Sequence, residues 1–235
     1  MGIVDKMNDL IEQLQVEEIV VSGRLIDASN ATLFGHLKSD KSFKVIYKPI
    51  AGERPLWDFP DGSLAAREMA AYLFSEKFDF NIVPPTVLRE GPFGYGVVQK
   101  WIDEAQPDNL IQIAQSSRDD LRSIFFFDVL INNADRKYGH ILVTKEDRVM
   151  GCDHGISFHS EDKLRTVLWQ FGGLEINSNE LGVLKQIEKF NFADFEALLS
   201  ANEIEAIFSR AKNLLQVKSF PTPAEDRPSV PWPPV

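Results

Sequence analysis

The chain has 235 residues, of which 44% are hydrophobic and 26% charged, and this composition is typical of a folded protein with a sizeable core. The net charge of −10 argues against a nucleic-acid partner and against adsorption to anionic membranes. The single cysteine, Cys152, excludes an intramolecular disulfide and a cysteine-based zinc site. We find no export signal and no apolar run of ~18 residues, and therefore expect a cytoplasmic protein without stable membrane insertion.

The N-terminal half is predicted to begin with a helix and to continue as an antiparallel sheet. Apolar residues recur at helical spacing over residues 4–15, which favours a short amphipathic helix. Three β-rich runs between residues 19 and 48 are separated by polar turns, a pattern typical of a meander. A helix rich in Ala, Leu, Glu and Met follows, with Asp61 or Ser63 as its cap, and a hairpin is expected over residues 86–101.

The C-terminal half is predicted to be mainly helical. A helix beginning at Ser117 has a body, residues 124–131, that is apolar all round, which indicates burial in a core. Residues 141–152 are typical of a hairpin, and residues 204–215 place apolar side chains on one face of a late helix. The prolines that follow Phe220 predict an extended, mobile tail.

Two acidic residues flank the second hairpin, Asp135 before it and Asp153 after it. A phosphotransferase needs one carboxylate to orient the acceptor hydroxyl and a second to hold Mg²⁺ against the triphosphate. The spacing from Asp135 to His140 equals that between the catalytic Asp and the metal-binding Asn of kinases, and Asp153 begins an Asp-x-Gly motif. Each motif alone is more typical of a solvated loop or a turn. Together, behind a buried helix, they favour a phosphotransferase site.

Such a site also needs a lysine on the third strand and a glutamate on the helix that follows. Lys48 ends the third β-rich run, and Glu68 lies early in the next predicted helix. Each of them alone is typical of a protein surface. Their order relative to Asp135 and Asp153 predicts that Lys48 neutralises phosphate charge and that Glu68 holds Lys48 in place.

Three further charged residues, Arg136, Lys137 and Asp128, lie close in sequence to Asp135. Arg136 and Lys137 either stabilise the charge of a transferred phosphoryl group or contact only solvent. Asp128 lies within the apolar helix, where a carboxylate needs a partner. We expect Asp128 to brace the loop before the hairpin through backbone N–H groups, as a structural residue.

Five short motifs follow one another along the chain: Tyr47-Lys48-Pro49, Arg67-Glu68, Val98 to Ile102, Asn133 to Arg136, and Cys152 to Phe158. In this order they resemble the phosphatidylinositol 3-/4-kinase superfamily, with the closest similarity to an uncharacterised bacterial branch known mainly from actinobacteria. The loop from Gly52 to Gly62 resembles that branch in particular. The resemblance covers roughly residues 17–215. It implies an α+β, bilobal, protein-kinase-like fold with ATP in the cleft between the lobes.

The resemblance also implies roles for single residues. Asp135, followed by Arg136, resembles the catalytic aspartate, and Asp153 resembles the metal-binding aspartate. Lys48 resembles the phosphate-binding lysine, and Glu68 its ion-pair partner. A phosphate-covering turn is implied at Ser29 and Asn30, although this turn lacks a Gly-x-Gly-x-x-Gly sequence. An adenine-binding hinge is implied at Gln99, Lys100, Trp101 and Ile102.

His140 departs from the family pattern, because many members have Asn at this position. Imidazole suits softer divalent metals better than it suits Mg²⁺. His140 is therefore interpreted as a ligand of Mn²⁺, as a phosphate contact, as a mark of weak activity, or as a structural residue at the start of a strand. The implied cofactors are ATP and Mg²⁺ or Mn²⁺.

Three regions are expected from these observations. Residues 1–101 form a small lobe with an antiparallel sheet, residues 102–216 form a mainly helical lobe that carries the catalytic hairpin, and residues 217–235 form a Pro-rich tail. The predicted function is an ATP-dependent kinase that transfers the γ-phosphate to an alcohol group. A protein or a small molecule is favoured as the acceptor over a phosphoinositide, because the chain is acidic and lacks accessory domains.

Other functions are weighed against this one. The main alternative is a nucleotide-binding pseudokinase that regulates a partner, with the Pro-rich tail as one docking segment. Self-phosphorylation as the only activity is a third hypothesis. A His-Asp metallohydrolase is the fourth, and it leaves Lys48 and Glu68 unexplained.

Overall fold

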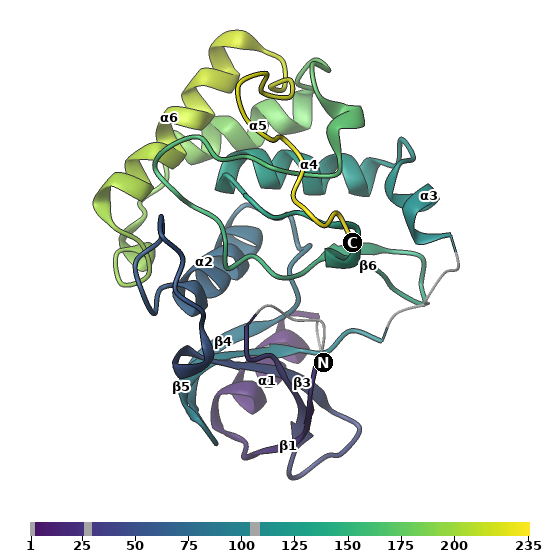
Figure 1. Ribbon diagram of the computed structural model, residues 1–235, viewed down its shortest axis with the longest axis vertical. Helices are drawn as coiled ribbons and strands as arrows, with labels where there is room; N and C mark the ends of the chain where they lie inside the picture. Colours follow the sequence, from purple (N-terminus) through teal and green to yellow (C-terminus); the bar gives the residue numbers. More distant parts are fainter. Residues whose placement is uncertain (1–2, 26–29, 104–108) are drawn as a thin grey trace.

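The computed structural model describes residues 3–25, 30–103 and 109–235, with side chains from Asn8 onward. Figure 1 shows a sheet-containing lobe below a larger helical lobe. The α+β, bilobal architecture expected from the sequence is thereby confirmed. In the part of the chain that the structure covers, no helix has both the length and the apolar character that a bilayer crossing requires.

The small lobe is built on one antiparallel sheet of five strands in the order β1-β2-β3-β5-β4. The strands span Ile19–Arg24 (β1), Leu33–Leu37 (β2), Lys44–Pro49 (β3), Thr86–Gly91 (β4) and Gly94–Lys100 (β5). Helix α1 (Ile3–Val16) packs against β4 and β5 and buries Leu14 in a core with Tyr47. Because successive side chains of a strand point to opposite faces, Lys48 then points away from this core, into the cleft.

Helix α2 (Leu64–Lys77) lies between the sheet and the helical lobe (Figure 1). The expectation that Asp61 or Ser63 caps it is wrong in its chemistry, since Ser63 occupies the cap position but makes no capping bond. The carboxylate of Glu53 accepts the backbone N–H groups of Leu64 at 3.1 Å and Ala65 at 2.8 Å. A carboxylate from a preceding loop thus satisfies the free donors at the positive end of the helix.

The large lobe packs its helices around one aromatic-rich core. Its elements are α3 (Leu110–Ala114), α4 (Asp119–Ile131), the hairpin β6 (Ile141–Val143) and β7 (Val149–Gly151), α5 (Ser178–Ile187) and α6 (Ala201–Val217). The predicted burial of the body of α4 is confirmed. Helices α3 and α5 were not predicted, although Asn177 and Glu180 form a capping box at the start of α5 that could have indicated it.

The Pro-rich tail is docked on the large lobe, so the expectation of a mobile tail is wrong. Phe220 is buried in the core, and Arg227 pairs with Asp162 at 2.8 Å. In Figure 1 the yellow end of the chain runs down the large lobe toward β6. The sequence pattern shows that these prolines cannot form a helix or a central strand, but not that their carbonyls meet backbone donors of the lobe.

Candidate active site

A cleft lies between the two lobes, and most of the residues singled out in the sequence line it. One cavity of about 410 Å³ is bordered by Lys48, Asp135, Asp153 and His140, and an adjoining pocket adds Glu68. These side chains come from β3, α2, the loop after α4 and the segments at each end of the β6–β7 hairpin. Side chains from both lobes therefore meet in one cleft. Lys48 and Asp153, for example, are 105 residues apart in the sequence.

Lys48 is the centre of an ion-pair cluster on the small-lobe side. Its Nζ pairs with Glu68 Oε1 and lies 2.8 Å from Asp153 Oδ1. Glu68 Oε2 also accepts the backbone N–H of His154 at 3.0 Å, so the glutamate on α2 fixes both the lysine and the chain that carries Asp153. The backbone of Asp153 is left-handed, with φ of 58°, which turns its carboxylate toward Lys48.

Charge in this cluster shifts the ionisation of its members. Burial raises the pKa of Glu68, although Lys48 works against this shift. Enclosure by the lobes disfavours the charged form of Asp153, but Lys48 and then His140 outweigh it and hold the pKa of Asp153 well below its usual range. Burial opposes the charge on Lys48 as well, and the two carboxylates raise its pKa above the usual value. Lys48 and Asp153 are thus both charged at neutral pH.

Asp135 lies on the large-lobe side of the same cleft. Its carboxylate is partly buried, with Lys137 Nζ at 3.5 Å as its charged neighbour. Burial raises the pKa of Asp135 to about 6; Lys137 lowers it and Asp153 adds to the rise. The backbone N–H of Asp135 is held by Asn133 Oδ1 at 3.0 Å. A carboxylate that titrates near neutrality and faces a cleft has the properties of a general base.

The position of Arg136 corrects the expectation that it faces a phosphoryl group. Its side chain is 0% exposed, and Nε and Nη2 donate to the two carboxylate oxygens of Asp128 at 2.9 and 2.8 Å. Nη1 donates to the carbonyl of Cys152 at 2.9 Å, and Nη2 lies 2.6 Å from His154 Nε2. Arg136 thus points into the core and ties α4 to the strand that precedes Asp153, because a guanidinium can satisfy several buried acceptors at once.

Asp128 braces the loop that carries Asp135, as the sequence indicated, but through different partners. Besides Arg136, it accepts the side-chain amide of Asn133 at 2.9 Å. The donors to its carboxylate are therefore side chains rather than the expected backbone N–H groups. The backbone N–H of Asn133 donates to the carbonyl of Asp128 instead, at 2.9 Å, as the helix ends.

His140 lies beside Asp153, with 3.4 Å between Nε2 and Oδ2. Burial lowers the pKa of His140 to about 4; Asp153 opposes this, and nearby cations add to it. The imidazole is therefore neutral at pH 7, and its Nδ1 accepts the backbone N–H of Lys137 at 3.5 Å. Within the described ranges, no three side chains of His, Cys, Asp or Glu form a cluster of the kind that holds a metal ion.

The four residues expected to form an adenine-binding hinge, Gln99 to Ile102, all border the cleft, but their backbone is only partly free for a ligand. The N–H of Lys100 donates to the carbonyl of Pro85 at 2.8 Å, and that of Trp101 to the carbonyl of Lys44 at 3.0 Å. The side-chain amide of Gln99 donates to Thr86 Oγ1 at 2.9 Å. Of the phosphate-covering turn, Ser29 lies outside the described residues. Asn30 borders the pocket, and its Oδ1 accepts the N–H of Arg54 at 2.8 Å.

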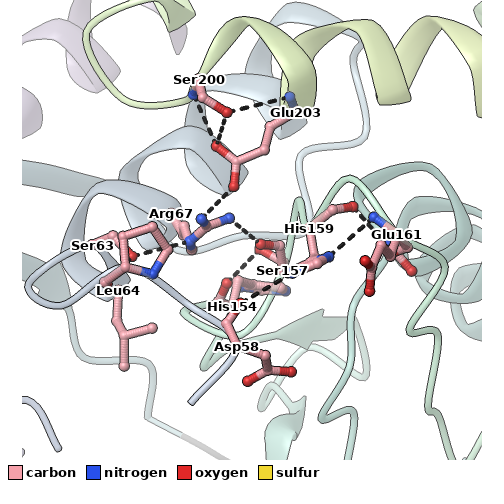
Figure 2. A network of polar contacts seen from close by, with 12 residues as sticks. Asp58, Ser63, Leu64, Arg67, His154, Ser157, His159, Glu161, Ser200 and Glu203 are labelled. Atoms are coloured by element: carbon pink, nitrogen blue, oxygen red, sulfur yellow. Dashed lines mark hydrogen bonds and ion pairs between the residues drawn. The ribbon is translucent and has the colours of Figure 1, made fainter. Parts of the chain in front are cut away.

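Sequence reasoning did not find that Arg67, the neighbour of Glu68 on α2, binds both halves of the large lobe. Figure 2 shows its guanidinium between Ser157 and Glu203. Nη1 donates to the carbonyl of Ser157 at 2.6 Å, Nη2 pairs with Glu203 at the start of α6, and the group lies 4.8 Å from the ring of Phe59. Two signals were visible in the sequence: the Arg67-Glu68 motif, and Ser200-x-x-Glu203, which forms a capping box. Neither of them shows that Arg67 and Glu203 meet.

Comparison with solved structures defines the class of fold. The Golgi casein kinase with Mn/ADP bound aligns with a TM-score of 0.62 and 14% identity over 92% of this chain and 76% of that one. The hydra Fam20 structure with sugar aligns with a TM-score of 0.63 and 12% identity over 92% and 89% of the two chains. The Helicobacter pylori proinflammatory kinase CtkA gives a TM-score of 0.51 and 13% identity over 88% and 94%. The chain therefore has a bilobal, kinase-like fold.

Sequence comparison places the chain more closely. It is 40% identical over 256 residues to Protein Rv2133c of Mycobacterium tuberculosis, with 92% of each chain covered, and it belongs to the family of that protein. No family model matches the chain.

Proposed function

We propose that the chain is an ATP-dependent kinase of the phosphatidylinositol 3-/4-kinase-like type, which transfers the γ-phosphate to an alcohol group. One observation carries the proposal: Lys48, Glu68, Asp135 and Asp153 line adjoining pockets of the cleft between the lobes of a kinase-like fold. We place the lobe boundary near residue 101, so that residues 1–101 and 102–216 face each other across the nucleotide.

Lys48 and the Asp153–His140 pair form the phosphate-binding side of the proposed site. Lys48, fixed by Glu68, would pair with phosphate oxygens. Mg²⁺ in nucleotide sites is held by one or two carboxylates together with phosphates and water, and a neutral imidazole is a good ligand for softer ions. Asp153 Oδ2 and His140 Nε2 lie 3.4 Å apart beside the cavity. Both would bind such an ion if the hydrogen of the imidazole moved to Nδ1, which would replace the 3.5 Å bond from the N–H of Lys137. A bound divalent cation would neutralise the charge that develops on the phosphates.

Asp135 acts on the acceptor in this mechanism. It hydrogen-bonds to the acceptor hydroxyl and takes its proton as the oxygen bonds to the γ-phosphorus and the bond from that phosphorus to the ADP oxygen breaks. A pKa of about 6 leaves most of the Asp135 carboxylate charged at pH 7 and keeps it basic enough to accept a proton. Arg136 has no part in this chemistry, and it holds the loop that presents Asp135.

The acceptor that fits best is a polypeptide or a small soluble alcohol. The net charge of −10 disfavours an anionic lipid surface. The name of one structural neighbour, Golgi casein kinase, supports a protein acceptor for this fold.

A pseudokinase is the second candidate, and His140 favours it. This residue stands where many members of the resembling family have Asn, and two backbone N–H groups of the proposed hinge already donate to the carbonyls of Pro85 and Lys44. Such a protein would bind nucleotide without transferring phosphate.

The test is thermal unfolding of wild type and Asp153→Asn with ATP alone and with ATP plus Mg²⁺ or Mn²⁺, followed by phosphate transfer from labelled ATP. Asp61→Asn, an exposed carboxylate before α2, is the matched control. At 100 times its dissociation constant, a ligand stabilises the native state by ~2.7 kcal/mol.

Three outcomes separate the candidates. A metal-dependent shift that Asp153→Asn loses and Asp61→Asn keeps supports the kinase. A shift without metal dependence and without transfer supports the pseudokinase. No shift with millimolar nucleotide contradicts both.

A further inference from the structure

The end of the tail, Ser229–Val235, lies against the loop that carries Asp135. The carbonyl of Ser229 accepts the backbone N–H of Thr166 at 3.0 Å, and the carbonyl of Pro234 accepts that of Tyr138 at 2.8 Å. Trp169 Nε1 adds a second bond to the Ser229 carbonyl at 2.7 Å. The tail end therefore bridges two segments of the large lobe on the acceptor side of the cleft.

These bonds belong to a layered arrangement of backbone. Arg136, next to Asp135, exchanges backbone hydrogen bonds with Arg165 and Val167, each of 3.1 Å. Thr166 lies between them and turns its N–H the other way, toward Ser229. The segment around Thr166 thus has the catalytic loop on one side and the tail on the other, which fixes the position of the tail relative to Asp135.

The tail is held here mainly through its main chain. The N–H groups of Thr166, Tyr138 and Trp169 all bind carbonyl oxygens of the tail. Trp232 is 90% exposed and Val235 is 65% exposed, while Pro231 is buried. Main-chain recognition of an extended segment does not depend on most of its side chains, so it accepts different sequences. The same donors would therefore serve another extended polypeptide.

The tail end reaches the reaction space but offers it no hydroxyl group. Val235 borders the same cavity as Asp135, Lys137 and His140. Residues Val230 to Val235 are Val, Pro, Trp, Pro, Pro and Val, so none of their side chains has a hydroxyl group that could accept a phosphoryl group.

From this arrangement we infer that the surface formed by Thr166, Trp169 and Tyr138 binds the acceptor as an extended polypeptide, and that Ser229–Val235, whose last six residues carry no hydroxyl group, occupies it here and competes with the acceptor. The inference rests on the proposed function for its chemistry. It names a polypeptide as the acceptor class and the tail as the group that limits access to it.

The first test is Val235→Ser, with Val230→Ser as the matched control, since Val230 does not border the cavity. With ATP and Mg²⁺ or Mn²⁺, the introduced oxygen bonds to the γ-phosphorus, the bond to the ADP oxygen breaks, ADP leaves, and Asp135 takes the hydroxyl proton. We expect phosphate at position 235 by mass spectrometry, at a rate independent of protein concentration and at least tenfold above that at position 230. Equal labelling at both positions, or none while ADP still forms, would overturn the inference.

A second variant tests the competition. Arg227→Ala removes the ion pair with Asp162 and loosens the tail. We expect it to raise several-fold the rate at which an unstructured Ser- and Thr-containing polypeptide is phosphorylated, with unchanged ADP release when no acceptor is present. An unchanged rate in Arg227→Ala would contradict the role of the tail.

If no variant forms ADP, the proposed function fails and the docking is tested by amide hydrogen exchange. The added polypeptide should protect the N–H groups of Thr166 and Tyr138 in Arg227→Ala. If it does not protect them, the surface is no polypeptide site.

Discussion

Two groups of paired cationic and acidic side chains lie near the loop that carries Asp135, and they differ in how much of their carboxylate oxygen is exposed. Beneath the loop, Arg136 and Asp128 are both 0% exposed and satisfy each other within the core. In the cleft, Lys48 joins Glu68 and Asp153, and the Asp153 side chain is 50% exposed. The polar atoms of the enclosed pair bond to each other inside the protein, so this pair stabilises the fold. In the open cluster, carboxylate oxygen of Asp153 remains exposed to the cleft.

The origin of the difference is the element that carries each carboxylate. Asp128 lies in α4, a helix buried on all sides, so its charge must find partners in the interior. The carboxylates of the other cluster pair with Lys48, which lies near the end of β3 on the face of the strand that borders the cleft. Oppositely charged side chains therefore pair inside the core in one place and beside an open cavity in the other.

The largest effect is expected where the enclosed pair is broken. Asp128→Asn leaves the guanidinium of Arg136 as an uncompensated buried charge, and we expect it to lower the free energy of unfolding by about 3–5 kcal/mol. Urea denaturation measures this, with Asp119→Asn, an exposed residue of the same helix, as the control. Equal midpoints for the two variants would mean that the pair carries no structural weight.

The link between α2 and the large lobe should give a smaller effect. Glu203→Gln keeps the size of the side chain but removes the charge that faces Arg67 and weakens the capping box at Ser200. We expect a loss of about 1–3 kcal/mol in the free energy of unfolding, together with a smaller nucleotide-induced shift, because α2 also carries Glu68. Glu205→Gln, exposed on the same helix, should change neither quantity.

A change of opposite sign is expected at Asp135. Its pKa of about 6 exceeds the unfolded value of ~3.9, so its contribution to stability is fully present below about pH 4 and is lost as the pH rises through 6. Asp135→Asn should therefore stabilise the fold by about 1–2 kcal/mol at pH 7, with no gain below pH 4, while phosphate transfer is lost. Denaturation at pH 4 and pH 7 compares the two, and a gain that is independent of pH would argue against the raised pKa.

The smallest effect is expected from a pair that is neither enclosed nor placed in the cleft. Lys38 and Glu18 lie 2.6 Å apart with both side chains largely exposed. Solvent screens such pairs, so Lys38→Gln should leave the unfolding midpoint and the nucleotide-induced shift unchanged. A measurable loss would show that the exposed pair behaves like the enclosed one and would weaken the contrast.

Local patterns were sufficient for most of the elements and for the order of the site residues. The strand that carries Lys48, the helix that carries Glu68, the buried body of α4 and the hairpin before Asp153 all follow from hydrophobic periodicity and turn residues. The short helices α3 and α5 were not predicted, because their apolar patterns extend over too few residues. The partners of Asp128 escaped because the sequence marks a buried carboxylate without showing which donors surround it.

The sequence by itself determined which residue types stand at the ends of which elements, because periodicity and turn chemistry act over a few neighbouring residues. Tertiary structure alone decided where those side chains point. Arg136 turns into the core, Glu53 caps α2, Arg67 pairs with a residue 136 positions away, and the tail folds back against the loop that carries Asp135. Each of these contacts depends on which buried charge or free N–H lies opposite, and that is fixed only when distant segments pack together.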